Sequence, residues 1–270
     1  KLERPDRSLQ WIGCLVDVEK GLGAMATQTV LVTGASRGIG HATVKRFSEA
    51  GWRIITCSRS PLHPSCPWDA GEENHLQIDL ASHEEIARGV DELMERLDGA
   101  PLHALVNNAG IQGNEYTVEE IDEEIWEAMT FIKMKATFFA ARAVIPGMKK
   151  RNYGKLINVS SIFAMEGSFS MSHYTGAASG VLGYAKGWAR ELAPWNICAN
   201  AVAPGTVATD LTINSMGWDV IHDFEKTVPM GRLAEKREIA YAVAWLASRE
   251  SDFVTGQLIS PTGGQTIVGI

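Results

Sequence analysis

Short apolar runs alternate with longer amphipathic stretches along most of the chain. We expect strands in the near-continuous apolar segments, which are 30–32, 54–56, 76–78, 104–106, 156–159, 197–202 and 258–259. Strands that are apolar on both faces are typical of a parallel sheet covered by helices on both sides. Between them, apolar residues recur three and four positions apart in 86–97, 181–192 and 239–246, which predicts amphipathic helices.

This alternation predicts an α/β fold: a single-domain, doubly wound Rossmann fold with a seven-stranded parallel sheet and helices on both faces. We assign residues 25–270 to the domain. Residues 1–24 show no apolar period, and we interpret them as an extension added by cloning or upstream read-through, with an arm that packs on another subunit as the alternative. Gly, Pro and polar residues cluster at 60–74, 110–117 and 204–218, where we expect loops.

Composition excludes several classes of function. The chain has 25 Lys and Arg against 32 Asp and Glu, a net charge of -7, and no basic run, which argues against nucleic-acid binding. No apolar stretch approaches the roughly 18 residues that would predict a membrane span. The four cysteines (Cys14, Cys57, Cys66 and Cys198) form no metal-type spacing, so we expect free thiols, no metal site and a cytoplasmic protein.

A glycine-rich loop, Thr33-Gly-Ala-Ser-Arg-Gly-Ile-Gly40, lies between the first predicted strand and a predicted helix. Glycines there let the backbone turn tightly and approach a pyrophosphate at the start of the helix. The position in a first strand–helix unit indicates a dinucleotide site, and a purely structural turn is the alternative. The candidate contacts are Gly34, Ser36, Arg37, Gly38, Ile39 and Gly40.

The choice of cofactor depends on the end of the second predicted strand. NAD sites usually place an acid there, which accepts from the ribose 2′-hydroxyl, whereas an arginine accommodates a 2′-phosphate. Here the strand ends in Ser58 and Arg59 with no acid, and Arg37 can reach the same region. Two cations without a carboxylate favour NADP(H) over NAD(H), although either arginine could be a solvated surface charge.

The chain resembles the short-chain dehydrogenase/reductase family, nearest to its ketoacyl-reductase-like members, over residues 29–268. The motifs that carry the resemblance are the 33–40 loop, Asp79-Leu80, Asn107-Asn108-Ala109-Gly110, Ser160-Ser161, Tyr174, and Pro204-Gly205 with Thr209. The resemblance implies a nicotinamide cofactor, a small-molecule carbonyl or alcohol substrate and a homotetramer or homodimer.

The same resemblance implies roles for individual residues. Ser161 would hydrogen-bond the substrate carbonyl, and Tyr174 would donate the proton. Asp79 would meet the adenine and Asn107 the ribose region, while Val207 and Thr209 would hold the nicotinamide end. The remaining motif residues expected at the cofactor are Leu80, Ala109, Gly110, Pro204 and Gly205.

One family residue is missing. Members of the family carry a lysine four residues after the tyrosine, but Ala178 stands there in this chain. A phenol titrates near pH 10, so it needs a nearby cation to exchange protons at neutral pH. Lys133 stands where the family carries an asparagine, and we hypothesise that its ammonium takes the place of the missing one. The alternative is a protein without redox chemistry, in which Lys133 points to solvent.

The sequence says less about the substrate pocket than about the cofactor site. Phe163, Met165, Met216 and Trp218 suggest an apolar pocket, with core or subunit contacts as the alternative. We expect an NADPH-dependent carbonyl reductase, or an alcohol dehydrogenase in the reverse direction. The other candidates are a nucleotide-binding sensor or assembly subunit with little turnover, and a non-redox enzyme on the same fold.

Overall fold

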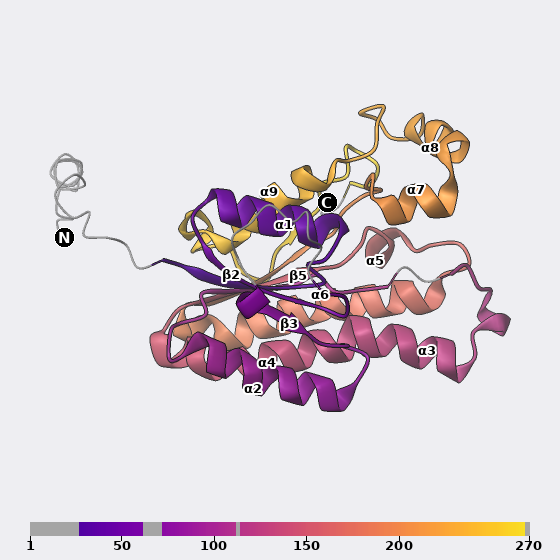
Figure 1. The fold of residues 1–270 in the computed structure, drawn as a ribbon. Coiled ribbons are helices and arrows are strands. Elements are labelled where there is room, and N and C mark those ends of the chain that lie inside the picture. Colours follow the sequence, from indigo (N-terminus) through magenta and orange to yellow (C-terminus); the bar gives the residue numbers. More distant parts are fainter. Residues whose placement is uncertain (1–26, 62–71, 112–113, 268–270) are drawn as a thin grey trace, which may run out of the picture.

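The computed structural model describes residues 27–61, 72–111 and 114–267, so the predicted extension at 1–24 lies outside the described residues. A seven-stranded, all-parallel sheet runs through this part of the chain in the order β3-β2-β1-β4-β5-β6-β7. Helices cover both of its faces (Figure 1). The prediction of a single, doubly wound α/β domain is confirmed.

The strands lie close to the predicted apolar segments. They are β1 (Thr29–Thr33), β2 (Arg53–Ser58), β3 (His75–Gln77), β4 (Ala104–Asn107), β5 (Gly154–Val159), β6 (Ile197–Val202) and β7 (Leu258–Ile259). The chain passes from β1 to β2 on one side and later resumes at β4 on the other side of β1. In open α/β sheets, ligands bind beyond the carboxyl ends of the strands at such a reversal.

Two layers of helices enclose the sheet (Figure 1). On one face α1 (Gly38–Glu49) packs against α9 (Lys236–Ala247). The other face carries α2 (His83–Leu97), α3 (Glu123–Thr130), α4 (Ala136–Arg151) and α6 (Ser172–Leu192). A π-helical turn, η4 (Phe131–Lys135), joins α3 to α4. The shorter elements are η2 (Glu72–Asn74), η3 (Val118–Glu120), α5 (Phe163–Glu166), η5 (Ala193–Trp195), α7 (Asp210–Met216), α8 (Trp218–Glu225) and η6 (Arg249–Ser251).

The core is split into two clusters because strand side chains alternate between the faces of the sheet. Leu105 and Leu156 are buried on the face of α2, α4 and α6. Their neighbours Val106 and Ile157 belong to the opposite cluster, with residues of α1 and α9. Burial on both faces explains why the strands are apolar throughout.

The prediction of a loop at 204–218 is wrong in part, because residues 210–216 form the helix α7. Thr209 provides the N-cap, with its Oγ1 accepting from the Thr212 N–H at 3.1 Å. The polar residues that suggested a loop therefore begin a helix. Within the residues that the structure describes, no helix is long and apolar enough to cross a membrane.

Candidate functional site

The glycine-rich loop turns tightly between β1 and α1. Gly34 and Gly38 adopt left-handed backbone conformations, with φ of 65° and 59°. A Cβ at Gly40 would lie 2.2 Å from the Gly34 carbonyl oxygen, so this position admits no side chain. The loop is tied to β2 because the Gly34 and Ala35 N–H groups both donate to the Cys57 carbonyl, at 2.7 and 3.2 Å.

The start of α1 fits a pyrophosphate. Arg37 occupies the N-cap without a capping side-chain hydrogen bond, and the first turn holds no acidic residue. The first N–H groups of a helix lack intrahelical partners and favour an anion. A Cβ at Gly38 would meet only the Thr209 methyl, at 3.8 Å, so the space on the Cβ side of this glycine is open. Ser36 is half-buried, and Ile39 packs against the core beneath α1.

Thr33 and Asn108 hold this loop in place. The Asn108 side-chain amide donates to the carbonyls of Thr33 and Gly34, at 3.0 and 3.1 Å. Thr33 Oγ1 accepts from the N–H groups of Asn108 and Ala109, at 3.1 and 3.0 Å. Both residues lie within the predicted motifs, but motif spacing does not reveal which of their groups are hydrogen-bonded.

Asn107 lies in the interior, at the carboxyl end of β4. Its side chain is 4% exposed and donates to Asn158 Oδ1 on β5 at 3.0 Å. The amide of Asn158 in turn donates to the Val181 carbonyl on α6 at 3.5 Å. This chain links β4 to β5 and α6, and Asn158 is a polar residue of the site that the sequence analysis missed.

A cavity of about 690 Å³ lies where β2 and β3 end. Its lining residues are Arg59, Ser60, Gln77, Asp79, Glu85 and Arg88. Arg59, the candidate for a 2′-phosphate, and Asp79, the candidate for the adenine, thus share one cavity. Asp79 accepts from the Ala81 N–H at 2.9 Å, and Leu80 packs against the core beside it. Arg37 and Arg59 are exposed, whereas Ser58 is buried.

The loop after β6 lies between α5 and the C-terminal segment. The Pro204 carbonyl accepts from the Ile162 N–H at 3.2 Å, and the Gly205 N–H donates to Pro261 at 3.2 Å. A Cβ at Gly205 would lie 2.9 Å from Gln265 Oε1, so the glycine permits this close packing. Val207 is buried and forms an isolated β-bridge with Ala234.

Lys133 and Tyr174 lie together although they come from different helical segments. The Lys133 ammonium is 5.5 Å from the centre of the Tyr174 ring. Phe163 links Tyr174 to Ser161. Its ring lies edge-on to the Tyr174 ring, with the ring centres 6.2 Å apart, and its N–H donates to Ser161 Oγ at 3.2 Å. The structure therefore brings the three candidate catalytic residues into one region.

Lys133 does not point to solvent. It is 5% exposed, and its Nζ donates to the Val159 carbonyl at the end of β5, at 3.3 Å. A Cβ at Gly110 would lie 3.3 Å from Nζ, so the glycine leaves room for the ammonium. Lys133 sits in the middle of the π-helical turn, a feature that is frequent at functional sites.

Ala178 leaves no cation on α6 beside Tyr174. The alanine is fully buried, and its carbonyl accepts from Ser160 Oγ at 2.9 Å. Two residues further along α6, Gly180 faces the π-helical turn, where a Cβ would lie 2.5 Å from the methyl carbon of Met134. The turn that carries Lys133 therefore packs closely against the helix that carries Tyr174.

His173 is buried beside Tyr116, with the ring centres 5.9 Å apart. Burial lowers the pKa of His173, and its Nδ1 has no hydrogen-bond partner in the structure. Glu166 accepts from the hydroxyl of Thr266, which ties α5 to the C-terminal segment. Trp218 is 57% exposed, so it does not form part of the core.

The described cysteines, Cys57 and Cys198, are buried free thiols. Burial raises the pKa of Cys57 to about 12, with the charge of Glu92 adding to the effect. A thiol with such a pKa is a poor nucleophile at neutral pH. Among the residues that the structure describes, no group of three or more His, Cys, Asp or Glu side chains gathers as metal ligands would.

Comparison with known proteins gives a consistent result. Residues 28–219 match the family described as short chain dehydrogenase. Protein FixR of Bradyrhizobium diazoefficiens is 36% identical over 245 residues, which cover 88% of this chain and 86% of FixR. The 3-oxoacyl-[acyl-carrier-protein] reductase FabG of Vibrio cholerae is 33% identical over 248 residues, 89% of this chain and 98% of FabG. The ligand-free aldohexose dehydrogenase of Thermoplasma acidophilum has a TM-score of 0.80 at 28% identity, covering 88% of this chain and 94% of that one.

Proposed function

Because this chain belongs to the short-chain dehydrogenase family, we propose that it is an NADP(H)-dependent reductase of carbonyl compounds, or a dehydrogenase of the corresponding alcohols. Enzymes of this family act on carbonyl and alcohol groups with a nicotinamide cofactor. The name of the FabG relative points to a 3-oxoacyl compound as the first substrate class to test.

The observation that carries this proposal is the buried ammonium of Lys133, 5.5 Å from the centre of the Tyr174 ring. A cation favours the phenolate over the neutral phenol. Lys133 therefore supplies the electrostatic role of the lysine that Ala178 replaces.

The proposed reaction assigns one task to each residue. The nicotinamide, when bound, supplies the hydride to the carbonyl carbon or takes it back from the alcohol. Ser161 donates a hydrogen bond to the substrate oxygen, since its Oγ accepts from the Phe163 N–H and keeps its own proton available. Tyr174 transfers its proton to that oxygen as the oxygen gains the electron pair of the carbonyl. Lys133 stabilises the phenolate until water returns a proton to it.

The preference for NADP(H) rests on the charges around the end of β2. Arg59 lines the cavity there, and Arg37 at the N-cap of α1 is exposed. A guanidinium binds a phosphate through paired N–H groups, whereas the ribose hydroxyl of NAD(H) is usually bound by a carboxylate. The strand ends at Ser58 and Arg59 follows it, with no carboxylate at either position.

Lys133→Ala tests the proposed chemistry. We expect kcat/KM for NADPH oxidation with a 3-oxoacyl thioester to fall by about 100-fold, because proton transfer by Tyr174 loses the cation that stabilises its phenolate, with a small change in the Kd of NADP⁺. Lys135→Ala is the matched control, because Lys135 lies in the same π-helical turn but is exposed. Adding Ala178→Lys to Lys133→Asn should restore activity. An unchanged kcat/KM in Lys133→Ala would show that the lysine has no such role.

A second candidate function is nucleotide binding without redox turnover, and Ala178 is the residue that favours it. With no lysine at this position, the usual source of the cation is gone. The two functions differ in a simple assay across a panel of ketones and 3-oxoacyl compounds. A binder titrates with NADPH, followed by its fluorescence, and never consumes it.

We also propose that the protein assembles as a homotetramer or homodimer. Phe138 is 41% exposed on α4, and its ring lies 5.7 Å from that of Tyr184 on α6. Tyr184 stacks in turn on Trp188 at 5.2 Å. Trp188 is buried and Tyr184 is half-buried, so Phe138 is the exposed edge of an aromatic cluster that spans two helices, which suits a subunit contact. Analytical ultracentrifugation of the wild type and Phe138→Glu would test this, with a smaller species expected for the variant.

A further inference from the structure

His75 connects β3 to the end of β2 through both of its ring nitrogens. The side chain is 8% exposed. Its Nδ1 lies 2.8 Å from Thr56 Oγ1, and its Nε2 lies 3.0 Å from the Ser60 carbonyl and 3.4 Å from Ser58 Oγ. One buried ring therefore contacts three residues of a five-residue stretch that ends beside the cavity.

The partners fix the tautomer of the ring. A carbonyl can only accept, so Nε2 carries the proton that is donated to Ser60. Nδ1 contacts the Thr56 hydroxyl, which also lies 3.4 Å from the Asn74 carbonyl. Burial lowers the pKa of His75, the hydrogen bond to Ser60 opposes this shift, and the charge of Arg96 adds to it. The ring is thus neutral at neutral pH and donates to Ser60.

These contacts close a turn around Arg59. The Ser60 carbonyl accepts a second hydrogen bond, from Ser58 Oγ at 2.7 Å. The Ser58 carbonyl accepts from the Ile78 N–H on the β3 side at 3.0 Å. Arg59 therefore stands between two fixed residues, while its own side chain is exposed and lines the cavity with Asp79.

We propose that His75 is a positioning residue for cofactor specificity, which holds the Ser58–Ser60 turn so that Arg59 meets the 2′-phosphate of NADP(H). This inference rests on the proposed function, since it places the adenosine end of the cofactor in the cavity at β2 and β3. If this turn were flexible, Arg59 would become ordered only when the cofactor binds. The conformational entropy lost in ordering a long side chain weakens the affinity for the cofactor. NAD(H) has no 2′-phosphate, so its binding does not depend on this arrangement.

The test compares NADP⁺ with NAD⁺ in His75→Leu and His75→Gln, with Kd values from isothermal titration calorimetry. His75→Leu should weaken NADP⁺ by about tenfold and leave NAD⁺ within about twofold. His75→Gln should keep most of the affinity for NADP⁺, because its amide nitrogen reaches as far as Nε2. His103→Leu is the matched control, since His103 binds the Thr29 N–H at the amino end of the sheet, and it should alter neither Kd.

Arg59→Ala separates a failure of this inference from a failure of the proposed function. If Arg59→Ala loses affinity for NADP⁺ while His75→Leu retains it, His75 does not position Arg59, and the proposed function stands. If His75→Leu weakens both cofactors equally and melts at a lower temperature, its role is structural and the inference is overturned. If the wild type binds NAD⁺ as tightly as NADP⁺ and Arg59→Ala changes neither, the proposed cofactor preference itself is wrong.

Discussion

The methyl carbon of Met134 lies where a side chain at Gly180 would stand, 2.5 Å from the Cβ that such a residue would carry. The π-helical turn therefore approaches α6 at a point where α6 has no side chain. Lys133 precedes Met134, and this close approach places its ammonium beside the Tyr174 ring. Packing between two helical segments thus brings the cation to the phenol.

Enlarging Gly180 should separate these groups. In Gly180→Leu the new side chain pushes the π-helical turn away, and we expect kcat/KM to fall at least tenfold, since the attraction between charges falls with distance. Met134→Ala in the same chain should restore part of the loss by removing the clash. Gly147→Leu on α4 is the control, because no atom lies within 4 Å of its Cβ position. Equal activity in Gly180→Leu and wild type would contradict the packing argument.

A methyl group at Gly40 should abolish tight cofactor binding. The Cβ of Gly40→Ala would lie 2.2 Å from the Gly34 carbonyl oxygen and 2.5 Å from the Asn108 amide, so the loop must shift. We expect the Kd of NADP⁺ to rise more than tenfold, as one lost charge-assisted hydrogen bond already costs about 1.5–3 kcal/mol. Gly147→Ala should instead stabilise the protein by up to about 1 kcal/mol without altering this Kd.

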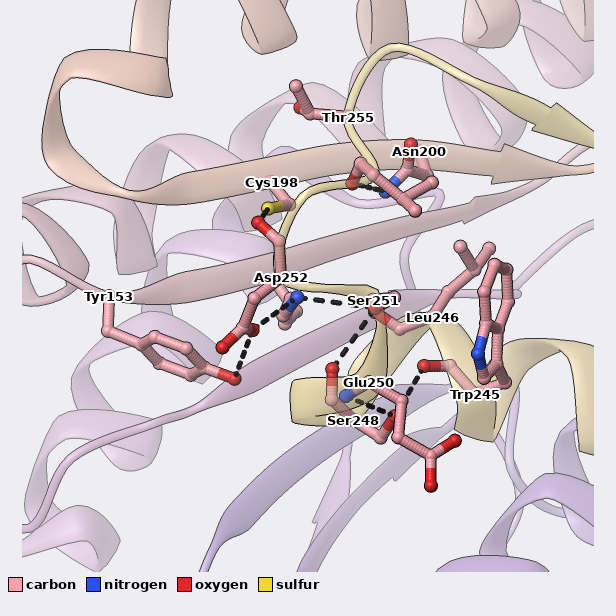
Figure 2. A network of polar contacts seen from close by, with 12 residues as sticks. Tyr153, Cys198, Asn200, Trp245, Leu246, Ser248, Glu250, Ser251, Asp252 and Thr255 are labelled. Atoms are coloured by element: carbon pink, nitrogen blue, oxygen red, sulfur yellow. Dashed lines mark hydrogen bonds and ion pairs between the residues drawn. The ribbon is translucent and has the colours of Figure 1, made fainter. Parts of the chain in front are cut away.

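A polar network at the amino ends of β5 and β6 should contribute to stability (Figure 2). Lys155 is 1% exposed and pairs with Asp252 at 2.8 Å, and its ammonium also donates to Ser251 Oγ at 3.2 Å. Asp252→Ala leaves a buried charge without its carboxylate, and we expect a loss of about 3 kcal/mol in urea unfolding. Adding Lys155→Met should recover much of this loss.

An exposed ion pair provides the control for that measurement. Lys226 and Asp223 form a pair of similar length, 2.7 Å, but their side chains are 75% and 80% exposed. Asp223→Ala should therefore change the unfolding free energy by less than about 0.5 kcal/mol. Similar losses in the two aspartate variants would mean that burial of Lys155 does not matter.

The stability contributed by Glu238 should depend on pH. Its hydrogen bonds from Arg232, followed by the Glu235 N–H, lower the pKa of Glu238 from 4.5 to about 2. A carboxyl whose pKa is lower in the folded state stabilises the fold above pH 4.5, and this contribution is lost as the pH falls from 4.5 towards 2. About a third of the side chain is exposed, so we expect a contribution of about 1 kcal/mol after screening.

Chemical denaturation of the wild type and Glu238→Gln at several pH values would measure this effect. The difference in unfolding free energy should be greatest near pH 6 and should shrink steadily towards pH 3. A difference that does not change between these two values would rule out the charge of Glu238 as its source.

The sheet and the glycine loop could be predicted from the sequence because each follows from a local requirement. A strand buried on both faces must be apolar, and Gly40 must lack a side chain where the loop folds back on itself. Such requirements leave a pattern that can be read without knowing the rest of the fold. The helix at 210–216 was missed because a polar N-cap such as Thr209 looks like a loop residue.

The contacts within the site could not be predicted in the same way. The family resemblance alone points to Lys133 beside Tyr174, and the π-helical turn that brings the two residues together leaves no pattern in the sequence. The hydrogen bonds of Asn108 to the glycine loop and of His75 to Ser60 join residues that are 75 and 15 positions apart in the sequence. Their partners are set by tertiary structure.

The placement of Lys133 and Tyr174 on different helical segments has a mechanical consequence. Two residues one turn apart on a single helix keep their spacing for as long as that helix exists. Here the spacing depends on how two segments pack, and Met134 against Gly180 is one of the contacts between them. Heat or pressure that loosens this packing should therefore stop proton transfer while the sheet, the π-helical turn and α6 are still folded. Enzyme activity would then fall when the packing between these two segments loosens, well before the chain unfolds.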